Sequence, residues 1–69
     1  MDKELFSEQA QIERKVFSFS LRENAKGRFF KITEDVGGRR DSVIIPATGL
    51  VEVRDIVDKA LKTSQECGV

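Results

Sequence analysis

The sequence predicts a single α+β domain, in which a four-stranded antiparallel meander is covered on one face by a C-terminal helix. Three observations predict this class. Apolar residues recur with period two up to residue 46, short runs containing glycine or asparagine separate these segments, and the period then changes to 3.6. A chain of 69 residues forms one domain at most, so we expect residues 1–69 to fold as one unit.

The first strand is predicted over residues 4–13. Phe6, Ala10 and Ile12 are spaced with period two there, which is typical of a strand. The glutamates and glutamines of this segment would also tolerate a helix. We favour the strand because "ERK" then forms a short turn into the next one.

The second strand, 15–23, reads "KVFSFSLRE" and alternates strictly between apolar and polar residues. "NAKG" follows as a turn, because Asn24 suits its start and Gly27 can take the positive φ that closes such a loop. Residues 28–35 form the return strand. A turn at "GG" leads to the fourth strand, 41–46, which ends at Pro46 because proline has no N–H for a ladder.

The helix is predicted over residues 48–63, with Thr48 as its N-cap and 64–69 as a frayed tail. Its apolar residues share one stripe at 3.6-residue spacing: Leu50, Val53, Ile56, Val57, Ala60 and Leu61.

Strand alternation divides the predicted sheet into two faces. The apolar face, which the helix covers, collects Phe17, Phe19, Leu21, Phe30, Ile32, Val43 and Ile45. The polar face collects Ser18, Ser20, Arg22, Phe29, Lys31, Thr33, Ser42 and Ile44. Phe29 and Phe30 are adjacent, so only Phe30 can enter the core, and Phe29 must face outward.

Composition argues against several classes of protein. The single cysteine, Cys67, cannot form an internal disulfide, and without histidine a zinc site is excluded in practice. We expect no cofactor and no metal, and we do not expect an enzyme, because no acid–base pair or nucleophile setting is evident. No apolar run is long enough to span a bilayer, and nothing at the start resembles a signal peptide, so we expect a cytoplasmic protein.

Charge is unevenly distributed although the chain is neutral overall. Residues 14–40 carry eight bases and three acids, whereas the flanking segments are acidic. The local field governs which ligands approach, so this middle segment favours anions. A solvated hairpin face explains the same charges equally well.

The outward ring of Phe29 admits two interpretations. It lies beside Arg22 and Lys31, and aromatic rings next to cations on a sheet suit single-stranded nucleic acid, since bases stack on the ring and cations follow the phosphates. Alternatively, Phe29 and Ile44 pack against a protein, and the chain is a homodimeric interaction module that uses its uncovered sheet face. The residues alone leave both open.

Residues 4 to about 62 resemble one PUR repeat of the purine-rich element-binding (Pur-alpha) family. The most specific part is the "K/R-x-N-x-K/R-G-R-F" signature, which this chain carries from Arg22 to Phe29, and "PATGLVEVRD" also resembles the start of the helix in the family's second repeat. The resemblance implies a ββββα fold in which two repeats intertwine, each helix crossing onto the other's sheet. Since this chain holds one repeat, the second repeat would come from another copy, giving a homodimer.

The resemblance further implies selective binding of purine-rich single-stranded DNA or RNA, with local opening of duplexes, in transcriptional or RNA regulation. It implies a location at the nucleoid in a bacterium, or in nucleus and cytoplasm in a eukaryote. By the same resemblance Arg22, Asn24 and Lys26 would contact phosphates and guanine edges, and Phe29 would stack on bases or wedge between them. The full set of nucleic-acid-binding residues that the resemblance implies is Ser20, Arg22, Asn24, Lys26, Arg28, Phe29 and Lys31. The chain departs from the family at Ser18, where many repeats have an aromatic ring, so the resemblance does not extend to a second stacking position.

Overall fold

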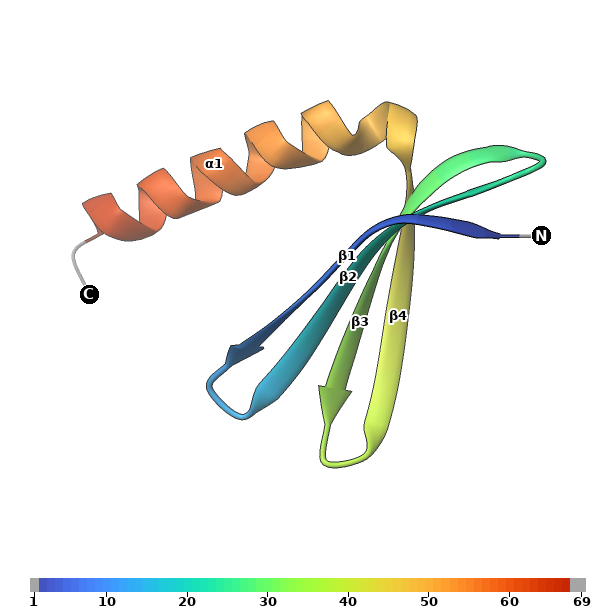
Figure 1. Ribbon diagram of the computed structural model, residues 1–69. Coiled ribbons are helices and arrows are strands. Elements are labelled where there is room, and N and C mark those ends of the chain that lie inside the picture. Colours follow the sequence, from blue (N-terminus) through green and yellow to red (C-terminus); the bar gives the residue numbers. More distant parts are fainter. Residues whose placement is uncertain (1, 68–69) are drawn as a thin grey trace.

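A computed structural model describes residues 2–67. Four strands form one antiparallel sheet in the order β1-β2-β3-β4 (Figure 1). Their bounds are Lys3–Ile12 for β1, Lys15–Asn24 for β2, Gly27–Val36 for β3 and Arg39–Pro46 for β4. A short 3₁₀ turn, η1 (Ala47–Gly49), leads into the helix α1 (Leu50–Glu66). The predicted ββββα order is confirmed.

The strand register confirms the two predicted faces. Leu21 of β2 lies opposite Phe30 of β3, which lies opposite Ile45 of β4, so these three side chains share the apolar face. The rings of Phe17, Phe19 and Phe30 form a row on that face, with centroid separations of 6.4 and 6.2 Å between successive rings. Alternation places Phe29 and Arg22, which also lie opposite each other, on the polar face.

A β-bulge interrupts the first strand. Glu4 lies opposite Arg22 and Phe6 lies opposite Leu21, so two steps on β1 match one step on β2, with the shift at Leu5. In a regular strand Glu4 and Phe6 would share a face. The bulge instead sends Phe6 to the apolar face and turns Glu4 toward Arg22.

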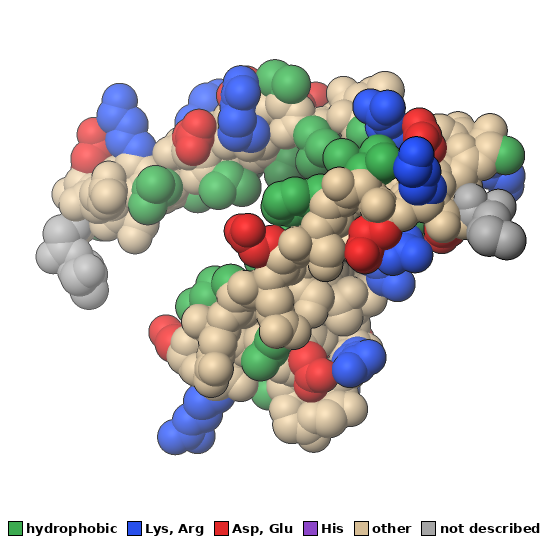
Figure 2. Space-filling view, in the orientation of Figure 1, with side chains coloured by type: hydrophobic (Ala, Val, Ile, Leu, Met, Phe, Trp, Pro, Cys, Tyr) green, Lys and Arg blue, Asp and Glu red, His purple; other side chains and the backbone are tan. Residues whose placement is uncertain are grey.

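The helix leaves the sheet instead of folding back over it (Figure 1). Its apolar stripe is largely open to solvent, since Ile56, Val57 and Leu61 are 57%, 57% and 56% exposed. The apolar side chains of the helix and of the sheet both line the open angle between them (Figure 2). Among residues 2–67 no side chain is fully buried, so the predicted covering of the sheet by a helix is not met within one chain.

Two predicted details of the helix are wrong. Thr48 does not cap it, because the chain first makes the 3₁₀ turn after Pro46, and Gly49 becomes the N-cap without a side-chain hydrogen bond. The helix also continues through Glu66, so residues 64–66 of the predicted frayed tail are helical. Residues 68 and 69 of that tail lie outside the described residues. Within the described part of the chain, α1 is too short and too polar to cross a membrane.

Candidate nucleic-acid interface

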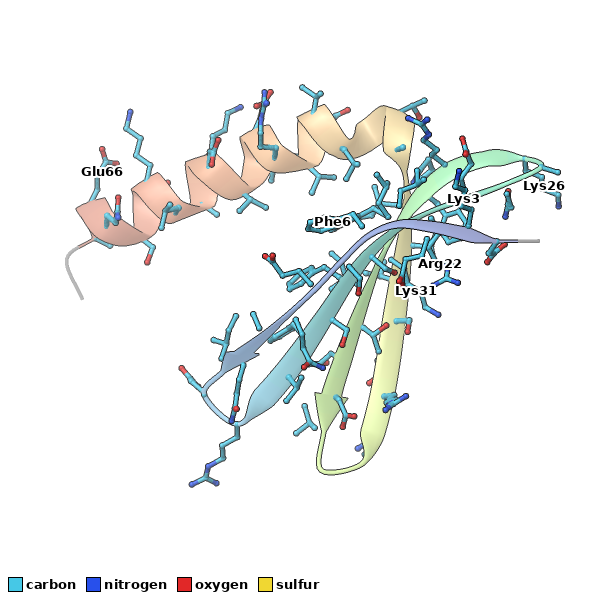
Figure 3. All side chains as sticks on the ribbon, in the orientation of Figure 1. Lys3, Phe6, Arg22, Lys26, Lys31 and Glu66 are labelled. Atoms are coloured by element: carbon cyan, nitrogen blue, oxygen red, sulfur yellow. The ribbon has the colours of Figure 1, made fainter. Side chains whose placement is uncertain are left out.

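The β2–β3 hairpin places the signature residues at one end of the sheet. Asn24 and Gly27 lie opposite each other, and Ala25 and Lys26 form the loop between them. The Asn24 side-chain oxygen accepts a hydrogen bond from the backbone N–H of Lys26 at 2.8 Å, a turn that asparagine favours. Gly27 has φ 132°, which residues with a Cβ rarely adopt. The "NAKG" sequence therefore fixes this loop, with the exposed Lys26 at its tip (Figure 3).

The polar face brings together five of the seven predicted site residues. Arg22 lies opposite Phe29, and in the next row along the strands Ser20 lies opposite Lys31. Asn24 follows Arg22 by two positions and shares its face. Figure 3 shows Arg22 and Lys31 on the side of the sheet away from the helix, while Phe6 points to the helix side. Phe29 is half-buried, so its ring is supported by neighbours and is not free in solvent.

Arg28 differs from the other predicted strand residues because it starts from the opposite face of the sheet. It precedes Phe29 and lies opposite Glu23, so its side chain starts from the apolar side of the sheet. Its Nε donates to a Glu23 carboxylate oxygen at 3.0 Å. The pairing neutralises Arg28 at the hairpin, where it contributes to the end wall of a groove.

The remaining cations of the signature differ in their partners. The Arg22 guanidinium is 3.4 Å from a Glu4 carboxylate oxygen through Nη1 and 3.7 Å from Asp2 through Nε. Within residues 2–67, neither Lys26 nor Lys31 has an ion-pair partner. The two lysines are therefore the cations that an incoming anion meets without displacing a carboxylate.

A shallow apolar groove runs beside Phe29. It has a volume of about 330 Å³ and is lined by Phe29, Ile44, Pro46 and the hairpin residues Asn24–Arg28 except Ala25. Pro46 lies opposite Phe29, and Ile44, which is 58% exposed, lies opposite Lys31. The volume is at the lower end of the range of small-ligand pockets. The groove thus joins an aromatic ring, an aliphatic wall and Lys26, and Lys31 lies opposite the groove residue Ile44 on the neighbouring strand.

Sequence reasoning missed Pro46 as a member of this surface and treated Ile44 only as a contact for protein. Both could have been found by continuing the alternation of "VIIP" to its last residue, since Pro46 follows Ile44 by two positions. Further from the groove the polar face carries hydroxyls, with Thr33 and Ser42 hydrogen-bonded at 3.1 Å and Gln9 donating to Ser18 at 3.4 Å. The apolar groove is therefore confined to the hairpin end.

Comparisons of the sequence with known proteins identify its family. A family model described as "PurA ssDNA and RNA-binding protein" matches residues 2–67. The transcription factor Pur-alpha 1 of Arabidopsis thaliana is 43% identical over 49 residues, which cover 71% of this chain and 17% of that relative's length. The matched part is thus a small fraction of the plant protein. Taken with the ββββα order and the signature hairpin, the match over nearly all of its residues shows that this chain belongs to the PurA family of single-stranded DNA- and RNA-binding proteins.

Proposed function

We propose that the polar face of this chain binds purine-rich single-stranded DNA or RNA selectively, and that it acts in transcriptional or RNA regulation. One observation carries the proposal. Phe29, Lys31 and the apolar groove lie on one face of the sheet, and Lys26, which lines the groove, lies at the tip of the adjoining loop. Within residues 2–67 neither lysine has an ion-pair partner. A stacked base contributes about 1–3 kcal/mol and lysines follow the phosphates, so the ring and the cations match the two parts of a nucleotide.

Local destabilisation of duplexes belongs to the same proposal. A side chain that unstacks bases must be apolar and large enough to replace a stacking partner, and the supported ring of Phe29 meets both conditions. The groove next to it gives a displaced base an apolar surface on which to rest.

We further propose that the functional unit is a homodimer in which each helix covers the sheet of the other copy. The exposed stripe of α1 and the open apolar face are two surfaces that one chain does not bring together. Each has the composition of a domain core, and exposed apolar surfaces of this kind mark interfaces. An intertwined pair would bury both and would leave the two polar faces on the outside.

Fluorescence anisotropy tests the binding function directly. A labelled GGN-repeat single strand is compared with a pyrimidine strand of equal length, and the purine strand should bind more tightly. A duplex with a fluorophore and a quencher at one end should open as protein is added. Equal and negligible binding to both single strands would exclude the function.

A protein-interaction module is the second candidate, and the exposure of Ile44 at 58% beside the groove is the observation that favours it. An apolar edge of this kind also suits a protein partner. The two candidates differ in their response to salt. Contacts with phosphates weaken steeply as salt increases, whereas an apolar contact between proteins does not.

A further inference from the structure

The β-bulge at Leu5 changes which charged groups surround Arg22 on the polar face. It turns Glu4 toward Arg22, and Asp2, two positions earlier, reaches the same guanidinium. Bulges often re-aim a side chain next to a functional site. Here the bulge directs two carboxylates toward Arg22, the cation that lies opposite Phe29.

The surroundings of Arg22 are therefore acidic, whereas a phosphate-binding site requires a net positive charge. One guanidinium faces two carboxylates, so these three groups together carry a charge of −1, and a phosphate that approaches Arg22 is repelled by the two carboxylates. Lys26 and Lys31 lack ion-pair partners among the residues that the structure describes. Phosphate is thus directed to the lysines and away from Arg22.

The guanidinium nevertheless keeps donors for a neutral acceptor. Of its five N–H groups, the carboxylates engage Nη1 and Nε through one contact each, at 3.4 and 3.7 Å. The remaining donors can meet an uncharged acceptor without the repulsion that a phosphate meets. On that edge guanine presents two acceptors, N7 and O6, and adenine presents N7, whereas thymine presents the single acceptor O4 and cytosine presents a donor. A guanidinium with two free donors therefore makes its paired contact with guanine best.

We infer that Asp2 and Glu4 are specificity-determining residues, which exclude phosphate from Arg22 and position its guanidinium for the N7 edge of a purine stacked near Phe29. The inference rests on the proposed function and assigns affinity and base selectivity to different residues. Lys26 and Lys31 supply affinity that depends on salt, and the Asp2–Glu4–Arg22 cluster supplies the choice of base.

The salt dependence of binding separates the roles. Each phosphate contact on a single strand contributes about −0.7 to the slope of log K against log salt. Two lysines on phosphate give about −1.4 per protomer, whereas three cations on phosphate give about −2. Lys26→Ala should flatten the slope by about 0.7 and leave the purine preference unchanged. Arg22→Gln should leave the slope unchanged and reduce the purine preference roughly five-fold or more.

The deciding variant is the double substitution Asp2→Asn with Glu4→Gln. It should bind purine and pyrimidine strands more tightly, steepen the slope by about 0.7 as Arg22 becomes a phosphate contact, and reduce the purine preference. Glu4→Asp retains the charge and should retain the preference. Glu66→Gln removes the same charge at the far end of the helix and should change neither quantity (Figure 3).

Three outcomes would overturn the inference. A tighter double variant with its preference intact would show that the carboxylates only compete with phosphate. Unchanged binding would show that they form a structural ion pair alone. If the unsubstituted protein binds neither strand, the proposed function itself is wrong. This outcome is distinguished from a failure of the inference alone because it is seen without any variant.

Discussion

Phe29 and Phe30 are adjacent in the chain and yet face opposite sides of the sheet. Phe30 lies in the aromatic row of the apolar face, 6.2 Å from Phe19 between ring centroids. Phe29 lies opposite Arg22 and Pro46 beside the groove. The phenylalanine at position 30 therefore contributes to stability, and we propose that the one at position 29 contributes to ligand binding.

Alanine at these two positions should separate the roles. Phe30→Ala removes a ring of the apolar face, which the proposed dimer would bury, and should cost about 3–5 kcal/mol of folding stability, which is enough to unfold so small a domain. Phe29→Ala should leave the melting temperature nearly unchanged and weaken single-strand binding by about 1–3 kcal/mol, the contribution of one stacked base. Thermal denaturation followed by circular dichroism and anisotropy titration measure the two effects.

Phe29→Tyr and Phe29→Trp are the matched controls. Both retain a π-face and should retain most of the binding. If the two alanine variants behave alike in both assays, Phe29 has no separate role as a ligand contact.

At the scale of elements, α1 is the feature that most requires a second copy. Val57 is 57% exposed in the single chain, and a charged residue at such a position is ordinarily harmless. In the proposed dimer the same side chain enters the core of the other copy. Val57→Asp should therefore unfold the protein instead of yielding a folded monomer, because it would bury an unpaired carboxylate. Circular dichroism and sedimentation, measured together, distinguish these results.

The control for this variant lies on the other side of the helix. Lys59 is outside the apolar stripe, and Lys59→Asp introduces the same side chain at a solvated position. It should fold and associate like the unsubstituted protein. A folded, monomeric Val57→Asp protein would contradict an interface that is part of the core.

The strands and their faces could be predicted because both depend on local alternation. Phe6, Ala10 and Ile12 did lie on the apolar side, as their spacing indicated. The bulge at Leu5 could not be predicted, because it arises from the pairing with β2 and leaves no mark in the period of residues 4–13. The ion pairs of Arg22 with Asp2 and Glu4 were missed for the same reason, since they depend on that bulge.

The helix shows a second limit of sequence reasoning. The apolar stripe of α1 was visible in the sequence as a period of 3.6 residues. The stripe indicates that an apolar surface covers the helix, but not whether that surface belongs to the same chain or to another copy. Thr48 failed as a cap because the turn begins at Pro46, and the geometry of that turn depends on how β4 ends against β3. Local signals define elements, and their placement depends on distant partners.

For the whole molecule, the radius of gyration and the accessible surface both indicate that a single chain lacks a complete core. The radius of gyration is 14.1 Å, whereas a compact domain of this length has roughly 11 Å. The accessible surface of 5957 Å² exceeds by about a third that of a compact monomer of the same mass. Apolar side chains of α1 and of the sheet line the open angle between them, where a compact domain would have its core (Figure 2).

We therefore expect an obligate homodimer. Sedimentation equilibrium at micromolar concentration should give twice the mass of the chain, and the melting temperature should increase with protein concentration because dissociation accompanies unfolding. A stable, folded monomer under these conditions would contradict the prediction. A melting temperature independent of concentration would do the same.

The outward course of α1 also has a kinetic consequence. If the helix finds its core only on another chain, the step that completes folding is an encounter between two molecules, and its half-time lengthens on dilution. Newly made chains would then mature slowly wherever they are scarce and quickly where many are translated together. Two related chains produced in one place could also exchange helices, so the partner would be chosen while the protein folds and not afterwards.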